Sequence, residues 1–232
     1  MARPSRPTIT RAEIIVAALA VIDAEGYEKL SLDRIAKWVG VKAPSLYYHF
    51  ENKEEILASV ARYIVSLVPM PPDLPMEFSE QYIISGCISL RSEILKHPRA
   101  AKLFTTYFPT KGIMPIVEQN TKRFLSLGIP TEMHMMVFEG LQIMTVGSAL
   151  QQATQRMSAL SALPGNGQHS ASGGLADAMV QNRWNDDEIF IEMLRSFLRG
   201  AVERAADGKA RGLSASTRTE AKTRSASNSK IQ

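Results

Sequence analysis

The feature that most constrains this chain is the segment from Leu30 to Lys53, LSLDRIAKWVGVKAPSLYYHFENK. Ser31 is a strong helix N-cap. Gly40 follows the first amphipathic stretch, where the backbone must turn, and glycine adopts left-handed conformations without a Cβ penalty. Ala36 places a small side chain where two short helices can cross at close range. The segment therefore predicts two short crossed helices joined by a tight turn.

Apolar side chains of this segment recur on one side of both predicted helices. Those expected to face inward are Ile35, Val39, Val41, Leu46 and Phe50. A helix over residues 10–25 precedes the segment and opens with a capping box of Thr10 and Glu13. A helix over residues 53–68, capped by Asn52, follows it. These two helices are expected to add to the same small core the side chains Ile14, Ala18, Ile22, Ile56, Leu57 and Val60.

The second crossed helix, expected to begin near Ala43, leaves its polar side chains on the outer face. A helix presented in this way fits the major groove of DNA, with its N-terminal residues near the base edges. Tyr, His and Lys side chains donate hydrogen bonds to phosphates, and a capped helix N-terminus offers amides to another phosphate. The candidate DNA-contacting residues are Ser31, Arg34, Lys37, Lys42, Ala43, Ser45, Tyr47, His49 and Lys53, with Tyr48 partly outward. An ordinary three-helix cluster with a polar face is the alternative.

The run VKAPSLYYHFENKEEIL resembles the recognition helix and the start of the next helix in the TetR family of regulators. The resemblance is close over residues 10–65, and residues 91–101 resemble a helix junction of the same family. It implies an all-helical homodimer whose C-terminal domain binds a small molecule and releases DNA, and it favours repression. It also implies DNA contacts at Ala43, Pro44, Ser45, Tyr47, His49 and Lys53. Asp33 and Ala43 depart from base-reading residues of a family member, so the operator sequence does not carry over.

The predicted N-terminal helices make up a head over residues 10–68. Beyond this head, helical periodicity punctuated by prolines continues, so the whole chain is predicted to have an all-α fold. The proline-dense stretch 69–75 is expected to be a hinge to a larger C-terminal effector-binding and dimerisation domain over residues 69–206. Further helices are expected near 77–96, 99–108, 114–127, 131–157 and 186–206, which makes about nine in total. A Gly- and Ser-rich loop is expected over residues 158–185.

Both ends of the chain are expected to lack a fixed fold. Residues 1–9 predict a flexible basic arm, because two prolines block a helix there. Residues 207–232 are rich in Ser, Thr, Ala, Lys and Arg and predict a disordered tail. This tail carries the whole formal net charge of +4. Bulk basicity therefore does not identify the folded part as a DNA binder, although the tail itself is a candidate for added sequence-independent affinity.

Two long helices of the C-terminal domain are expected to pair with a second copy of the chain. The helix over residues 131–157 carries Gly140 and Gly147 as points of close approach, and the helix over residues 186–206 has a wide apolar face. Two recognition helices about 34–36 Å apart match successive major grooves of a duplex. We therefore expect a homodimer bound to a double-stranded DNA operator.

Aromatic, methionine and cysteine side chains make the C-terminal domain a candidate for an adaptable apolar pocket. The candidate pocket residues are Tyr82, Cys87, Phe104, Tyr107, Phe108, Met114, Phe138 and Met144. His97 and His134 are further candidates to orient a polar group. The predicted effector is a small apolar or amphipathic molecule of unknown identity. Plain core packing, and a regulator without an effector, are the alternatives.

Several function classes are disfavoured. The four histidines show no metal-ligand spacing, and nucleophile motifs and phosphate loops are missing, so no enzyme activity, metal or cofactor is expected. The single Cys87 allows no intrachain disulfide and fits a reducing cytoplasm. No apolar run reaches the roughly 18 residues of a membrane span. The apolar run 14–22 behind Arg3, Arg6 and Arg11 also matches a signal peptide, but it serves better as the first helix of the head.

Overall fold

The computed structural model describes residues 9–109, 113–161 and 181–228, with residues 156–161 and 209–228 described by their backbone only. Its α-helices are α1 (Arg11–Glu25), α2 (Leu32–Val39), α3 (Lys53–Ser66), α4 (Ser79–Lys96), α5 (Leu103–Thr106), α6 (Met114–Ser126), α7 (His134–Ser161) and α9 (Asp186–Asn228). Single 3-10 turns are η1 (Tyr27–Lys29), η2 (Ala43–Ser45), η3 (Met76–Phe78), η4 (Pro98–Ala100) and η6 (Thr131–Met133). The expected all-α fold is confirmed, with eight α-helices in the described residues.

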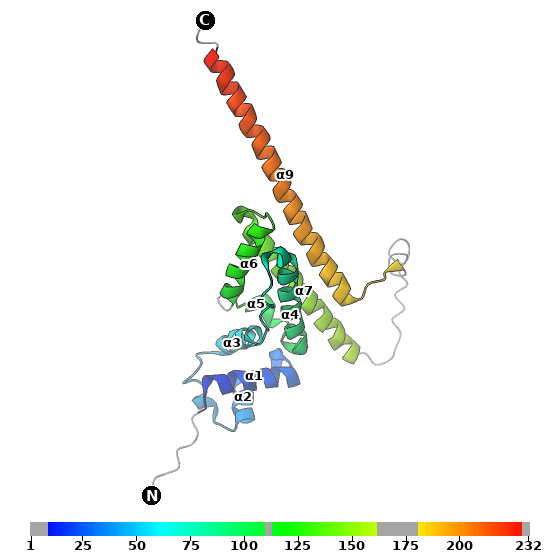
Figure 1. The fold of residues 1–232 in the computed structure, drawn as a ribbon. Coiled ribbons are helices and arrows are strands. Elements are labelled where there is room, and N and C mark those ends of the chain that lie inside the picture. The colour runs from blue at the N-terminus through cyan, green and yellow to red at the C-terminus, as the bar shows by residue number, and fades with distance from the viewer. Residues whose placement is uncertain (1–8, 110–112, 162–180, 229–232) are drawn as a thin grey trace.

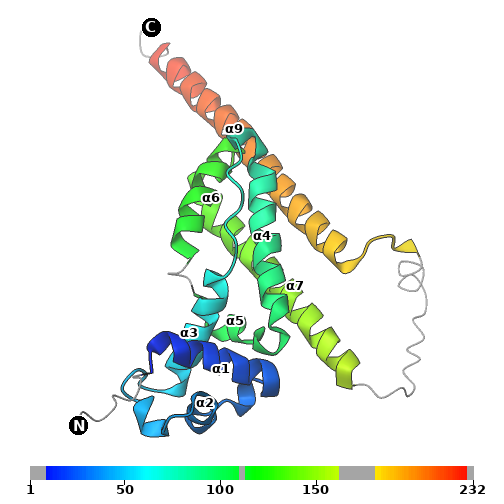
Figure 2. The ribbon, with the colours of Figure 1, turned by 60° about the horizontal axis from the view of Figure 1, so that its bottom comes forward.

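Figure 1 shows α1, α2 and α3 gathered at one end of the molecule as the N-terminal head. Helices α4, α6 and α7 stand on this head, and the second view shows the same arrangement (Figure 2). Helix α9 packs on α4 and α7 and then continues past them. Its C-terminal end therefore points away from the head.

The N-terminal caps expected from the sequence are all present. The Thr10 amide donates to the Glu13 carboxylate at 2.7 Å, which completes the capping box of α1. Ser31 caps α2, and Gly40 ends it with the left-handed φ of 71° that favours glycine. The Asn52 side-chain oxygen accepts from the Glu55 amide in the first turn of α3, at 2.8 Å. These caps fix where each helix of the head begins and ends.

One hydrophobic core joins the head to the neighbouring ends of α4, α5 and α7. From the head it contains the expected residues Ile14, Ala18, Ile22, Ile35, Leu46, Phe50, Ile56, Leu57 and Val60. Val39 and Val41 are only partly buried. From the C-terminal half the same core contains Ile94, Leu95, Ala100, Ala101, Leu103, Phe104, Ile113, Val146, Ala149 and Ala153. The head is thus packed directly on the C-terminal half, in addition to the covalent link through residues 67–75.

A second core lies between α4, α6, α7 and α9. Its buried members are Ile83, Ile84, Phe124, Ile129, Val137, Leu141, Phe190, Leu194, Leu198 and Ala201. The buried guanidinium of Arg91 on α4 crosses its edge, donating to Ser148 of α7 at 2.9 Å and to Asp187 of α9 at 2.6 Å. One cation therefore links three helices that are far apart in sequence.

Some expected helix bounds were wrong. The helix expected over 99–108 is the turn η4 followed by the four-residue α5, because prolines at 98 and 109 bracket the segment and shorten it. Helix α3 ends at Ser66, before the expected 68. Helix α7 runs to Ser161, so the expected loop begins later, and residues 162–180 of it lie outside the described residues. The same is true of residues 1–8 of the expected arm.

The expectation of a disordered tail was wrong for residues 207–228, which continue α9. The stretch contains no proline, and nine of its 22 residues are Ala, Arg or Lys, which favour helix. Its first turns are already formed by the packed part of α9, so the costly nucleation step is not repeated. Residues 229–232 lie outside the described residues.

Candidate nucleic-acid interface

The recognition segment, residues 42–50, is not the regular α-helix expected from the sequence. It opens with the 3-10 turn η2, and the amides of Leu46 and His49 each donate to the carbonyl three residues earlier, at 3.0 and 2.9 Å. The amide of Phe50 makes one α-type bond, at 3.1 Å. Pro44 has no amide hydrogen to donate, and so short a segment gains little from cooperative helix propagation. The segment holds its place because Leu46 and Phe50 are buried in the core.

The outer face of the recognition segment carries most of the predicted DNA-contacting side chains. Tyr47 is 60% exposed, and Tyr48, expected to be only partly outward, is 89% exposed. Lys42 and Pro44 are also exposed. The predicted residues that are partly buried are Ala43, Ser45, His49 and Lys53. These side chains all belong to the stretch that follows α2 and ends at the first residue of α3.

The two predicted residues at the start of α2 are engaged within the head. The Ser31 side chain accepts from the Arg34 amide at 3.3 Å. The Arg34 guanidinium forms an ion pair with Glu25 at the end of α1. Arg34 is therefore held toward α1 although it is exposed, as is Lys37 on the same helix.

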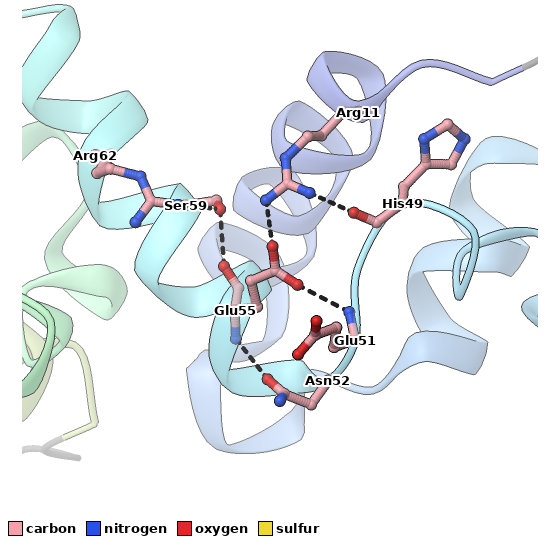
Figure 3. A network of polar contacts seen from close by, with 7 residues as sticks. All are labelled: Arg11, His49, Glu51, Asn52, Glu55, Ser59 and Arg62. Carbon is pink, nitrogen blue, oxygen red and sulfur yellow. Dashed lines mark hydrogen bonds and ion pairs between the residues drawn. The ribbon is translucent and has the colours of Figure 1, made fainter.

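A polar network that the sequence did not reveal ties the recognition segment to α1 and α3 (Figure 3). Arg11 of α1 lies over the Phe50 ring, with its guanidinium carbon 4.0 Å from the ring centroid. It donates to the His49 carbonyl and, at 2.5 Å, to one carboxylate oxygen of Glu55. The other Glu55 oxygen accepts from the Glu51 amide at 2.8 Å. Partners 38 and 44 residues apart leave no local signal, which is why Arg11 and Glu55 were missed.

The Glu55 carboxylate is well suited to this role. The hydrogen bond from Arg11, followed by that from the Glu51 amide, holds its pKa below the usual value. The Glu55 carbonyl also accepts from Ser59 at 2.8 Å, and Ser59 accepts in turn from Arg62 at 2.6 Å. Glu55 is therefore ionised at neutral pH, and side-chain hydrogen bonds stabilise the helix turn that begins at Glu55.

The C-terminal end of α1 is held by the segment between α4 and α5. The Nδ1 atom of His97 lies 2.8 Å from a carboxylate oxygen of Asp23. Arg99 donates to the Asp23 carbonyl at 3.0 Å and to the Ala24 carbonyl. Carbonyls at the end of a helix have no intrahelical donor, so a cation placed there is stabilising. This contact connects the head to the part of the chain that leads into the C-terminal half.

A cavity of about 70 Å³ lies where α4, α6 and α7 meet the end of α3. Of the predicted pocket residues, Tyr82, Cys87, Phe108 and Phe138 line it. The lining residues that the sequence did not single out include Val65, Pro69, Asn120, Leu141, Gln142 and Thr145. The wall at Val65 and Pro69 belongs to the end of the head and its link, so the cavity touches both halves of the chain.

The other predicted pocket residues lie elsewhere. Phe104 is buried in the core shared with the head, and Tyr107 packs against that core. Met114 is 45% exposed at the start of α6. Met144 lines a groove between α7 and α9. Periodicity alone did not separate pocket from core, because both use the same apolar side chains.

The two histidines suggested for ligand orientation are also placed away from this cavity. His134 is buried, with its Nε2 atom 3.1 Å from the Ile129 carbonyl, and its ring packs on Phe124. His97 contacts α1 as described above. Both serve as internal contacts, so neither lines the cavity.

The polar chemistry of the cavity comes from uncharged groups. The Asn120 side-chain oxygen is buried and has no hydrogen-bond partner among the described residues. The Thr145 hydroxyl donates to the Leu141 carbonyl at 2.7 Å. Burial raises the pKa of the Cys87 thiol to about 11, so it is protonated at neutral pH. No charged side chain lines the cavity in the described part of the chain.

The family model described as bacterial regulatory proteins, tetR family, matches residues 14–60, which span α1 to α3 with the recognition segment. The tetracycline repressor protein class E of Escherichia coli is 26% identical over 151 residues, 62% of this chain and 70% of the relative. The head of the chain is thus a TetR-family DNA-binding domain. The relatives that the chain matches are transcriptional regulators, and the chain is itself a transcriptional regulator that binds DNA.

Solved structures share the fold of this regulator. ActR, a TetR family protein of Streptomyces coelicolor in complex with (S)-DNPA, superposes with a TM-score of 0.69 at 24% identity over 85% of this chain and 99% of ActR. BioQ with its natural double-stranded DNA operator superposes with a TM-score of 0.57 at 24% identity over 66% of this chain and 93% of BioQ. At this identity the similarity establishes the fold alone.

Two further properties of the described residues bear on function. No group of three or more His, Cys, Asp or Glu side chains among them is arranged to hold a metal ion. Over the same residues, helices that combine the length and hydropathy of a membrane span are absent.

Proposed function

We propose that this regulator binds double-stranded operator DNA through residues 42–53 and the start of α2, and represses transcription until a small effector fills the cavity. The recognition segment carries the proposal. Anchored by Leu46 and Phe50, it presents Lys42 and Tyr47 to solvent, and the polar ends of these two side chains have no partner within the described residues. Donors held on a fixed surface without internal partners suit phosphates and base edges.

The proposed contact set contains the residues predicted from the sequence: Ser31, Arg34, Lys42, Ala43, Pro44, Ser45, Tyr47, His49 and Lys53. Tyr48 joins them because it is 89% exposed. Arg34 contributes least, since its guanidinium must leave Glu25 before it can reach a phosphate. The complex of BioQ with its operator supports a DNA-bound state for this fold.

We further propose a homodimer formed through α7 and α9. Ile143 of α7 and Met193 of α9 are 69% and 47% exposed. Large apolar side chains exposed on neighbouring helices are typical of a surface that another protein covers. Gly147 has open space where a Cβ would stand, so a partner helix can approach closely. Gly140, expected to serve the same purpose, is instead covered by Phe197 of its own chain.

The effector that suits the cavity is small, uncharged and largely apolar, with one hydrogen-bond donor for Asn120. An isolated charge would lose its hydration there without meeting a counter-charge. The volume of about 70 Å³ accommodates few heavy atoms, since a cavity of about 150 Å³ holds benzene. A larger effector must therefore displace side chains. The complex of ActR with (S)-DNPA supports small-molecule binding by this fold.

A genome-fragment selection with purified protein tests the proposal. We expect enrichment of a two-fold symmetric operator, release of that operator by a fraction of cell metabolites, and higher transcription of the adjacent gene when the regulator is deleted. The variant Asn120→Leu should resist release, whereas Gln119→Leu on the exposed side of α6 should not. Selection that enriches no sequence over random fragments would contradict operator binding, and lower transcription on deletion would contradict repression.

A further inference from the structure

The recognition segment depends on contacts from other helices because few hydrogen bonds hold it internally. Residues 43–49 form a 3-10 turn followed by further turns instead of a continuous helix. Its C-terminal end and the residue that follows it are fixed from outside, by Arg11 of α1 at His49 and by Glu55 of α3 at Glu51. A surface that reads DNA must hold its side chains closely in place, so these outside contacts matter more here than in a regular helix.

We propose that Arg11 and Glu55 are positioning residues for DNA recognition, which hold Tyr47 and its neighbours in the conformation that fits the duplex. The inference rests on the proposed function, in which residues 42–53 contact DNA. Both side chains act through the backbone of residues 49–51, where Arg11 donates to the carbonyl of His49 and Glu55 accepts from the amide of Glu51.

The N–H groups of Arg11 that take part in the network donate to acceptors within the protein. The guanidinium donates to the His49 carbonyl and to the Glu55 carboxylate from two different nitrogens. Its Cζ atom lies 4.0 Å from the Phe50 ring centroid. A planar fork that satisfies two acceptors and covers an aromatic ring is a property of arginine that lysine lacks. Arg11 is therefore placed to organise the segment, and a bond to phosphate would have to compete with these contacts.

Substitution of Glu55 distinguishes positioning from simple electrostatics, because the two predict opposite changes in the affinity for DNA. A carboxylate near DNA repels phosphates, so its removal should strengthen binding if charge alone matters. In the network, however, both Glu55 oxygens accept hydrogen bonds. A glutamine at this position can satisfy one donor, while its NH₂ group opposes the other. Positioning therefore predicts that Glu55→Gln weakens binding to the operator.

The matched control is Glu54→Gln. Glu54 is exposed, lies in the same first turn of α3, and loses the same charge on substitution. We expect Glu55→Gln to weaken operator binding roughly ten-fold, the scale of one charge-assisted hydrogen bond, and to change binding to a scrambled duplex much less. Glu54→Gln should bind the operator as tightly as the parent protein or more tightly. Equal behaviour of the two variants would overturn the inference.

Arg11→Lys and Arg11→Gln test the other half of the network. Both lose the fork, but lysine keeps the charge, so positioning predicts that the two variants weaken operator binding equally and leave the salt dependence unchanged. A direct phosphate contact predicts instead that lysine preserves affinity and that glutamine lowers the slope of log K against log salt by about 0.9. That second pattern would overturn the role assigned to Arg11.

Two more measurements make the outcome specific to positioning. The double variant Arg11→Gln/Glu55→Gln should lose little more affinity than either single variant, because both remove the same network. Full additivity would contradict a shared network. Tyr47→Ala distinguishes failure of the proposed function from failure of the positioning inference. If this variant binds the operator like the parent protein, the proposed function fails. If it weakens binding while Glu55→Gln behaves like Glu54→Gln, the positioning inference alone fails.

Discussion

Asn120 brings to the cavity a buried side-chain oxygen that has no hydrogen-bond partner in the described part of the chain. An unpaired buried polar atom costs about 1–3 kcal/mol, and a ligand donor that reaches it recovers that energy. The surrounding Tyr82, Phe108 and Phe138 supply apolar area but little selectivity. At the scale of single residues, Asn120 is therefore what distinguishes a ligand with a donor from a hydrocarbon of the same size.

Cys87 reports on the same cavity, because it is the only cysteine in the sequence. Burial raises its pKa from 9.0 to about 11, so we predict that iodoacetamide alkylates it at pH 8 about 100-fold more slowly than a free thiol. Because the folded state holds this proton more tightly than the unfolded state, the associated stability is complete below pH 9 and is lost as the pH rises toward 11. Mass spectrometry over time gives the rate, and modification as fast as that of a free thiol would contradict the raised pKa.

At the scale of elements, the sequence predicted the head better than the rest. Caps at Thr10, Ser31 and Asn52 and the turn at Gly40 are local signals, and all of them hold in the structure. The recognition segment was predicted as a helix because periodicity does not reveal that a short proline-containing stretch stops at a 3-10 turn. Half of the predicted pocket residues do not line the cavity, since long-range packing decides which apolar side chains surround a void.

The contact between Arg99 and the end of α1 predicts a measurable loss of stability. Arg99→Ala removes the donor to the carbonyls of Asp23 and Ala24, so the free energy of unfolding should fall by about 1–2 kcal/mol in urea denaturation. The control is Arg195→Ala, which breaks an exposed pair with Glu192 on α9 and should cost less than about 0.5 kcal/mol. Equal losses in the two variants would show that the Arg99 contact adds no more to the free energy of unfolding than an exposed ion pair does.

At the scale of the whole molecule, the exposed apolar face of α7 and α9 predicts the oligomeric state. Ile143→Glu places a charge on the proposed interface, so we expect a monomer in sedimentation experiments and operator affinity reduced at least ten-fold, because one head cannot engage two half-sites. Leu125→Glu, on the exposed side of α6, should remain dimeric. A parent protein that sediments as a monomer would contradict the proposed dimer.

The direction of α9 predicts that its basic extension does not add DNA affinity. The backbone of residues 207–228 continues the helix away from the head, where the duplex is proposed to bind (Figure 1). Truncation after residue 206 should leave the slope of log K against log salt unchanged. A shallower slope in the truncated protein would show that the extension reaches DNA.

The most direct test of the whole account is the affinity for operator DNA when Ser45, Tyr47 and His49 are replaced together by alanine. None of these side chains belongs to the fully buried core, so the variant should keep its helical circular dichroism and unfold within a few degrees of the parent protein. We expect operator affinity, measured by fluorescence anisotropy at fixed salt, to fall at least 100-fold. A folded variant that binds the operator as tightly as the parent protein would contradict DNA binding through this segment.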